Sequence, residues 1–304
     1  MSYLLIIFAG LLGLVVGSFI NVLTLRWNPA EDTQVIKIVR GRSHCLRCGQ
    51  QLKWFELIPI LSFIFLRGRC RYCRKKLIWQ YPLVEGLTAL IFAGVTWRIL
   101  DFNFFAHYFF SDPRTNFWVV AVILIWLFYA AVLIALSIID LRHYLLPDKI
   151  VFPAIAISLL ANLSFYFLSL TRGSLFPAHG LNFLGPYADV VNVHFNVLTS
   201  ALAGAFILSI ILFLIYAFSR GKAMGFGDVK LAILIGLMLG LGAGLIGLGL
   251  SFIIGAFVSL IIVLATKKKL KDAVPFGPFL ALGVLAVFFF GQTLTNFYFS
   301  LFNV

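Results

Sequence analysis

The chain has little charge. Only 12% of its 304 residues are Asp, Glu, Lys or Arg, whereas 62% are hydrophobic, and the mean hydropathy is +1.04. In a soluble domain about a quarter of the residues are charged and about half are apolar. The shortage of charge excludes an ordinary soluble enzyme, and the apolar excess excludes a disordered chain. The composition therefore indicates a membrane protein.

Acidic residues are the scarcest charged class, at 11 Asp and Glu against 24 Lys and Arg, for a formal net charge of +13. A basic soluble protein often binds nucleic acid, but in a membrane protein Lys and Arg mark the loops that face the cytoplasm. Twenty-one of the cations lie in four segments between apolar runs, at 26–80, 141–149, 220–230 and 267–271. We interpret this charge as a topology signal and expect no nucleic-acid partner.

Apolar runs of about 20 residues, long enough to cross the hydrocarbon core, recur along the chain. With the N-terminus outside, eight spans put every cation-rich segment on the cytoplasmic side. The first run lacks a basic start and a small-residue cleavage site, so we expect a retained helix rather than a cleaved signal peptide. The Gly-rich stretch Leu239–Gly249, between the sixth and seventh spans, offers only a tight turn. The predicted spans lie near 3–25, 82–100, 117–139, 150–170, 195–218, 229–246, 248–266 and 275–302.

Three parts follow from this topology: a first transmembrane helix at 1–25, a cytoplasmic segment at 26–80 and a transmembrane bundle at 81–304. On the opposite face, 171–194 forms a long loop containing Gly, Pro and His, and its residues indicate no role.

The chain has only four cysteines, and all lie in segment 26–80 as two C-x-x-C pairs: Cys45, Cys48, Cys70 and Cys73. Two such pairs fit one tetrahedral zinc ion, and four protein ligands leave no open position, which is typical of a structural site. The alternative is two disulfides, which the reducing cytoplasm disfavours. We therefore expect an all-α, polytopic bundle of about eight transmembrane helices with a small cytoplasmic zinc-binding domain.

Two of the few carboxylates lie at predicted cytoplasmic ends of spans. Asp140 ends the third span, and Asp228 opens the sixth, within Gly225-Phe226-Gly227-Asp228. If they face each other, they share a proton, as in an aspartic protease. Gly225 and Gly227 would let a substrate backbone come close to Asp228. The alternative is that both aspartates cap helices or pair with Arg142 and Lys230.

Ordered motifs along nearly the whole chain resemble those of bacterial type IV prepilin peptidases. The motifs are Gly17-Ser18-Phe19-Ile20-Asn21-Val22, Arg42-Ser43-His44-Cys45, Cys48-Gly49, Ile58-Pro59-Ile60-Leu61-Ser62, Arg67-Gly68-Arg69-Cys70, Tyr81-Pro82-Leu83-Val84-Glu85, Leu146-Pro147-Asp148, Gly225-Phe226-Gly227-Asp228-Val229-Lys230-Leu231 and Pro275-Phe276-Gly277-Pro278-Phe279-Leu280-Ala281.

The resemblance implies a membrane aspartyl protease of the bacterial inner membrane. Asp140 and Asp228 match its catalytic pair, Gly225, Gly227 and Lys230 its substrate-binding motif, and Glu56 and Glu85 are candidates for methyl transfer. The substrates would be prepilins of type IV pili and pseudopilins of type II secretion. They would be cut after Gly at the cytoplasmic face and N-methylated by S-adenosylmethionine.

Two alternatives stay open. In the first, the protein is a peptidase without methyltransferase activity, because Leu46, Trp27-Asn28-Pro29 and the long loop 171–194 depart from the common pattern of the family. No Gly-rich signature locates a site for S-adenosylmethionine. In the second, it is a zinc-stabilised membrane transporter or scaffold. The scarcity of ionisable residues within the spans disfavours the transporter.

Overall fold

A computed structural model describes residues 2–27, 42–45, 47–101, 113–172, 196–265 and 274–301. These ranges contain eight α-helices, one short 3-10 helix and no strand, only isolated bridges. Seven of these helices are long and apolar enough to cross a membrane. The predicted all-α, polytopic architecture is therefore confirmed.

The chain forms two compact units, Met1–Ala135 and Leu136–Val304. The predicted boundaries at residues 25 and 80 were drawn from topology, and they stay predictions. From residue 173 onward, the predicted loop 171–194 lies outside the described residues.

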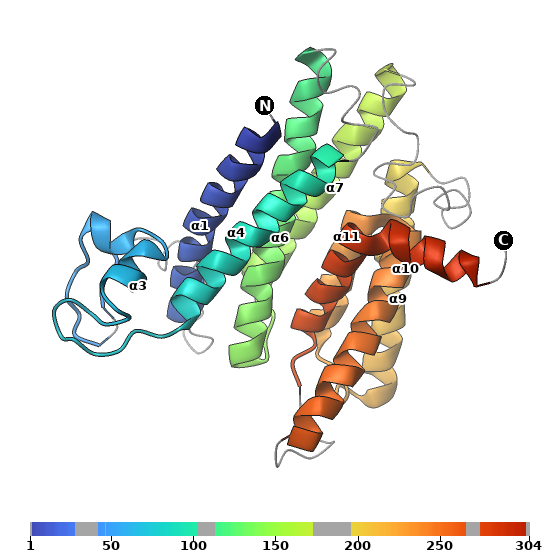
Figure 1. The fold of residues 1–304 in the computed structure, drawn as a ribbon. Coiled ribbons are helices and arrows are strands. Elements are labelled where there is room, and N and C mark those ends of the chain that lie inside the picture. Colours follow the sequence, from blue (N-terminus) through green and yellow to red (C-terminus); the bar gives the residue numbers. More distant parts are fainter. Residues whose placement is uncertain are drawn as a thin grey trace. The chain divides into compact units, whose positions relative to one another are not determined.

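In the first unit, α1 (Ser2–Arg26) packs against α4 (Gln80–Asp101) through glycines (Figure 1). A Cβ on Gly13 would lie 2.7 Å from the Cα of Ala89, and one on Gly17 would lie 2.8 Å from the Cα of Glu85. The spacing Gly13-x-x-x-Gly17 puts both glycines on one face, as in other close transmembrane helix pairs. This close contact brings the C-terminal end of α1 beside the N-terminal end of α4.

Polar side chains join the same two helix ends. Buried Asn21 donates from Nδ2 to the carbonyl oxygen of Tyr81 at 3.1 Å and accepts from Gln80 Nε2 at 3.2 Å. Between α1 and α4 the chain forms the 3-10 helix η2 (Trp54–Leu57) and the short helix α3 (Leu61–Phe65). Glu56 lies in η2, and the two cysteine pairs lie before η2 and after α3.

In the second unit, the helices are α7 (Asp148–Arg172), α9 (Val197–Ser219), α10 (Phe226–Ala265), α11 (Gly277–Ser300) and the end of α6 (Pro113–His143). Asn196 caps α9 by accepting from the backbone N–H of Thr199 at 2.9 Å. Left-handed Arg220 ends it, where Gly221 N donates to the carbonyl of Tyr216. The apolar runs thus end at ordinary capping residues.

The longest element, α10, combines the sixth and seventh predicted spans and reverses direction at Gly240, whose φ of 74° and ψ of −173° are not helical. Along α9, the ring of Phe226 meets the ring of Tyr216 edge-on, while a Cβ on Gly240 would meet Ser200. Beyond the reversal, a Cβ on Gly244 would lie 3.1 Å from Leu208. The first limb of α10 therefore runs along α9 from its C-terminal end to its N-terminal end, and the second limb runs beside α9 in the opposite direction.

The reversal lies within Leu239–Gly249, where a turn was predicted, but near its start. The first limb, Phe226–Leu239, has 14 residues and is about 21 Å long at 1.5 Å per residue. It is therefore shorter than the predicted span 229–246. Two polar side chains bind backbone groups at the turn. Asn162 Nδ2 donates to the carbonyl of Leu237 at 2.9 Å, and Leu241 N donates to Ser200 Oγ at 3.2 Å.

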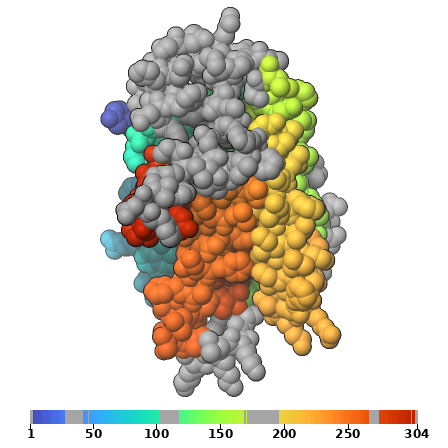
Figure 2. All heavy atoms as spheres, turned by 90° about the vertical axis from the view of Figure 1, so that its right-hand side faces the viewer, coloured from blue at the N-terminus to red at the C-terminus, as the bar shows by residue number. Residues whose placement is uncertain are grey.

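Glycines let α9 and the first limb of α10 approach closely. A Cβ on Gly236 would overlap the backbone of Gly204 and Ala205, and one on Gly204 would lie 2.7 Å from the carbonyl carbon of Gly240. Figure 2 shows the two helices side by side, α9 in yellow and α10 in orange. This packing holds the start of α10, and with it Asp228, in a defined position.

Candidate functional site

Asp140 lies in the last turn of α6 and is buried, with 5% of its surface exposed. Its Oδ2 accepts a 2.8 Å hydrogen bond from the backbone N–H of Gly277, the first residue of α11. A helix N-terminus carries unpaired N–H groups and a partial positive charge, so it stabilises a carboxylate placed there. The alternative that Asp140 caps a helix is therefore correct in part, although the helix is not its own.

Asp228 lies in the first turn of α10 and is also buried, with 7% exposed. Its Oδ2 accepts a hydrogen bond from Gly225 N at 3.3 Å. The carboxyl groups of Asp228 and Asp140 lie within electrostatic range of each other. Two buried carboxyl groups from different helices of one unit are therefore near each other, an arrangement that the predicted topology permits.

Lys230 pairs with a third carboxylate rather than with Asp228. Its Nζ lies 2.6 Å from Asp148 Oδ1, and it also lies over the rings of Phe152 and Phe226, at 5.4 and 5.3 Å from their centroids. The predicted substrate contact of Lys230 is not tested by this geometry. The alternative pairing of Lys230 with Asp228 is not the one that the structure shows.

The predicted substrate glycines differ in their surroundings. A Cβ on Gly225 would lie 3.8 Å from Asp228 Oδ2, which is ordinary contact, so the backbone beside Asp228 is open. A Cβ on Gly227 would lie 3.0 Å from the Cβ of Leu146. Contact with Leu146 is therefore sufficient to explain why residue 227 is a glycine. The open space beside Asp228 lies at Gly225.

In the first unit, the four cysteine thiols converge. Their Sγ atoms all lie within 4.8 Å of one another, and none of the four forms a disulfide. Zn–S bonds of 2.3 Å in a tetrahedron put the sulfurs about 3.8 Å apart, so these thiols could hold one zinc ion. His44 is exposed, with its Nδ1 3.3 Å from the carbonyl oxygen of Arg42, and it is not part of the cluster.

The two C-x-x-C pairs are flanked by matching backbone hydrogen bonds. Cys45 N donates to the carbonyl of Gln50 and Cys70 N to that of Lys75, both at 2.9 Å. Each turn is flanked by one isolated antiparallel bridge, and the residue after its second cysteine, Gly49 or Arg74, has a positive φ. The sequence showed no repeat here, because the two turns share little besides their cysteines.

Neighbouring groups act on the thiol pKa values. Burial would raise the pKa of Cys45, but the backbone N–H groups of Arg47 and Cys48, with the thiols of Cys48 and Cys70, lower it to about 7. At Cys48, the backbone N–H of Gln50 lowers the pKa, but desolvation and the neighbouring thiols of Cys45 and Cys73 raise it to about 11. The opposite shifts of the two pKa values show that the neighbouring thiols act on one another.

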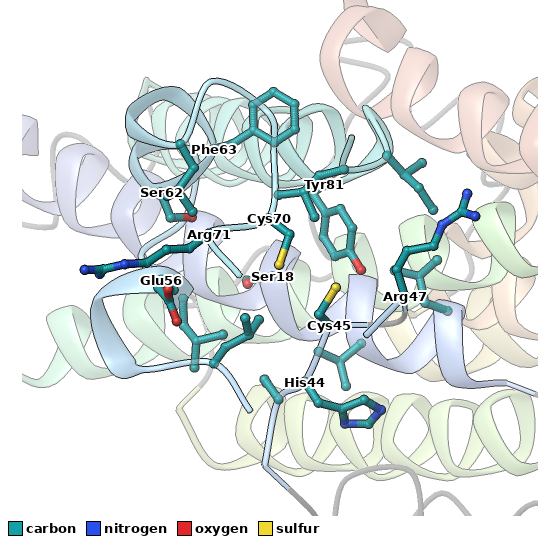
Figure 3. Close-up of a pocket in the computed structure, with 18 of the residues that line it drawn as sticks. Ser18, His44, Cys45, Arg47, Glu56, Ser62, Phe63, Cys70, Arg71 and Tyr81 are labelled. Carbon is teal, nitrogen blue, oxygen red and sulfur yellow. The ribbon is translucent and has the colours of Figure 1, made fainter. Parts of the chain in front are cut away.

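Glu85 and Glu56, the two candidates for a second activity, are both buried near the cysteines. Glu85 Oε2 accepts a 2.7 Å hydrogen bond from Ile60 N, where the chain has a φ of 60°, and Glu85 also bonds the hydroxyl of Ser18. Glu56 Oε2 accepts from Lys53 N at 2.8 Å. Glu56 lines one pocket together with Cys45 and Cys70 (Figure 3). Glu85 lines the same pocket.

With this geometry in place, the comparisons with known proteins identify the family. The sequence matches the bacterial peptidase A24 N-terminal domain over residues 11–99 and the type IV leader peptidase family over residues 127–260. A prepilin leader peptidase/N-methyltransferase of Xanthomonas campestris pv. campestris is 31% identical, over 94% of this chain and 92% of its own length. The chain belongs to the type IV leader peptidase family.

Further relatives agree with this assignment. Prepilin leader peptidase/N-methyltransferases of Aeromonas hydrophila and Pseudomonas putida are 30% and 31% identical, over 95% and 92% of this chain. These alignments cover 91% and 88% of the relatives. No solved structure matches the chain.

Each site lies within one of the two matched regions of this family. Asp140 and Asp228 are both within 127–260, and the cysteines and both glutamates are within 11–99. The sequence alone indicated no role for Gly277, which binds Asp140. The motif Pro275-Phe276-Gly277-Pro278 pointed to it, but only the structure shows that α11 begins against Asp140.

Proposed function

We propose that this member of the family cleaves the basic leader of prepilins and pseudopilins and then N-methylates the new N-terminus. One observation carries the proposal: buried Asp140 and Asp228 come from two helices into electrostatic range. They do so in a chain 31% identical to a named prepilin leader peptidase/N-methyltransferase over 94% of its length. Cleavage would follow Gly, at the cytoplasmic face of the bacterial inner membrane.

The two aspartates divide the chemistry of peptide hydrolysis. Two carboxyls held close together share one proton, so one acts as base and the other as acid. We assign Asp140 as the base, because Gly277 N and the N-terminus of α11 stabilise negative charge on it. It takes a proton from water as the water oxygen bonds to the scissile carbonyl carbon. Asp228 donates its proton to the carbonyl oxygen, which gives a tetrahedral diol. The C–N bond then breaks as Asp140 passes its proton to the leaving nitrogen, and one hydroxyl of the diol returns a proton to Asp228.

The start of α10 would position the extended leader. Because Gly225 has no side chain beside Asp228, a substrate backbone could lie against this turn. Gly227 also adds no side chain to the turn. Lys230 has three N–H donors, of which one meets Asp148, so it could also donate to a substrate carbonyl. A basic leader would not use Lys230 as a counter-charge, so its role would be hydrogen bonding.

The cysteine cluster would serve the second activity as a structural element. Cys45, Cys48, Cys70 and Cys73 would hold one zinc ion, which closes the two turns and stabilises a segment with little core of its own. S-adenosylmethionine would supply the methyl group, which passes from its sulfur to the freed amine nitrogen while that nitrogen loses a proton. Glu56 and Glu85 stand beside this cluster. The N-terminus would lie outside, with membrane lipid around the spans.

The test of the peptidase is Asp140→Asn and Asp228→Asn, which keep side-chain shape and remove the acid–base chemistry. Each variant should lower kcat for prepilin cleavage by ~10²–10⁴-fold, the usual contribution of a general acid or base. Asp101→Asn, at the exposed end of α4, is the matched control and should cleave normally. Full cleavage by both active-site variants would refute the assignment.

A further inference from the structure

A pocket of about 160 Å³ lies in the unit Met1–Ala135, beside the cysteine turns (Figure 3). Its wall comes from the two turns, from η2 and α3, and from the adjoining ends of α1 and α4. Apolar side chains such as Leu57, Phe63 and Ile78 form much of it. Glu56 and Glu85 are the acidic residues among those that line it.

Glu56 carries an unsatisfied oxygen. Its side chain is 93% buried, since only 7% of its surface is exposed, and its Oε1 has no hydrogen-bond partner among the described residues. Its other oxygen, Oε2, accepts from Lys53 N, so the carboxyl is held in place. A buried acceptor without a partner is costly, and a native structure keeps one where a ligand or another missing donor completes it.

The second carboxyl of the pocket differs in this respect. Glu85 binds Ile60 N and the Ser18 hydroxyl, so its hydrogen bonds go to the protein. It ties the Ile60 turn to α4 and supports the wall. Of the two glutamates, Glu56 is therefore the one whose carboxyl has an oxygen without a hydrogen-bond partner.

Four cations line the same pocket, Arg26, Arg47, Arg71 and Lys76, and none of them forms an ion pair with Glu56 among the described residues. The guanidinium of Arg71 lies over the ring of Phe55, with Cζ 5.3 Å from the centroid. Figure 3 shows the end of this side chain directed away from Cys45 and Cys70. A buried carboxyl without a cationic partner favours a cationic ligand, because burial strengthens the attraction between opposite charges.

We propose that this pocket binds a primary ammonium group attached to an apolar moiety, with Glu56 Oε1 as the acceptor. The proposal rests on the proposed function, in which two molecules carry such a group. One is the methyl donor, through its amino-acid end, and the other is the processed substrate, through its newly freed N-terminus. In either case the ammonium donates to Oε1 while Leu57, Phe63 and Ile78 enclose the apolar part.

The test is direct binding to the purified full chain in detergent. Four probes form two pairs: S-adenosylhomocysteine with 5′-methylthioadenosine, which lacks the amino-acid end, and a mature-pilin peptide with its N-acetylated form. Each is titrated into the wild type, Glu56→Gln and the control Asp101→Asn, which removes one exposed acidic charge.

The outcomes separate the two sources of the ammonium. If the ammonium belongs to the methyl donor, Glu56→Gln weakens the binding of S-adenosylhomocysteine by ~10–100-fold and leaves the binding of 5′-methylthioadenosine unchanged. This is the loss expected when a hydrogen bond to a charged group is removed. If it belongs to the substrate, the same loss appears with the free peptide and not with the acetylated one. Glu56→Gln affinities within twofold of wild type for all four probes would overturn the proposal.

Two further measurements keep the result interpretable. Zinc content and prepilin cleavage report whether Glu56→Gln is folded. If Glu56→Gln is not folded, the comparison of probes on the wild type decides. The proposal then requires that each amine-bearing probe of the pair concerned bind the wild type at least about tenfold more tightly than its amine-free partner. A wild type that cleaves prepilin but shows no such preference refutes the pocket alone. A wild type that fails to cleave refutes the proposed function.

Discussion

Gly277 offers a sharp test of how Asp140 is held. Its N–H donates to Asp140 Oδ2 at 2.8 Å, and a Cβ at this position would lie 2.8 Å from the same oxygen and 3.3 Å from Cγ. Real side chains essentially never accept such a contact, so Gly277→Ala must push the Asp140 carboxyl away from the start of α11. The change leaves both aspartates in the chain and moves only one of them.

The expected size follows from the bond that is lost. A hydrogen bond to a charged group contributes about 1.5–3 kcal/mol, and each 1.4 kcal/mol is a factor of ten in rate. If the bond holds the Asp140 carboxyl in the orientation that the reaction requires, its loss lets the carboxyl leave that orientation, and Gly277→Ala should lower kcat by ~10–100-fold. The effect on KM should be small, because in the proposed mechanism Gly277 acts on Asp140 and not on the leader.

The assay is cleavage of a purified prepilin by wild type and variant in the same detergent, with kcat and KM determined separately. The control is Gly249→Ala in the second limb of α10, where a Cβ would meet nothing within 4 Å. It introduces the same methyl group into another helix and should cleave normally. A folded Gly277→Ala protein with wild-type kcat would show that Asp140 does not need this contact.

Two further predictions concern the metal and the packing. The wild type should contain one zinc ion per chain by metal analysis, and Cys45→Ser or Cys70→Ser should lose it and lower the Tm; metal-free protein with two disulfides would contradict the zinc site. Gly236→Ala should lower the free energy of unfolding by ~1–3 kcal/mol, because its Cβ would overlap the backbone of Ala205. A Gly236→Ala Tm equal to that of Gly249→Ala would contradict the close approach of α9 and α10.

Much of the cysteine cluster was predictable because its geometry is local. Two residues between Cys45 and Cys48, and between Cys70 and Cys73, put each pair of thiols on one side of a turn. The meeting of the two pairs was the only long-range step. The matching hydrogen bonds of the turns, and the unsatisfied oxygen of Glu56, depend on backbone conformation and were visible only in the structure.

The aspartate pair was predictable only in part. Topology placed Asp140 and Asp228 at similar depth, but depth does not specify the direction of a side chain around its helix. Close packing through Gly236 and Gly204 holds the start of α10. The contact with Gly277 joins residues 137 positions apart in the chain, so no pattern within a single segment could reveal it.

The sequence by itself determined that the chain is a helical membrane protein, because insertion into lipid depends on the summed apolarity of about 20 consecutive residues. It also determined which few polar groups could carry chemistry, because so few are present. Tertiary structure decided where α10 reverses, which N–H binds Asp140 and which carboxyl oxygen stays without a partner. Those features depend on contacts between helices remote in the chain, where a single methyl group at Gly236 or Gly277 would not fit.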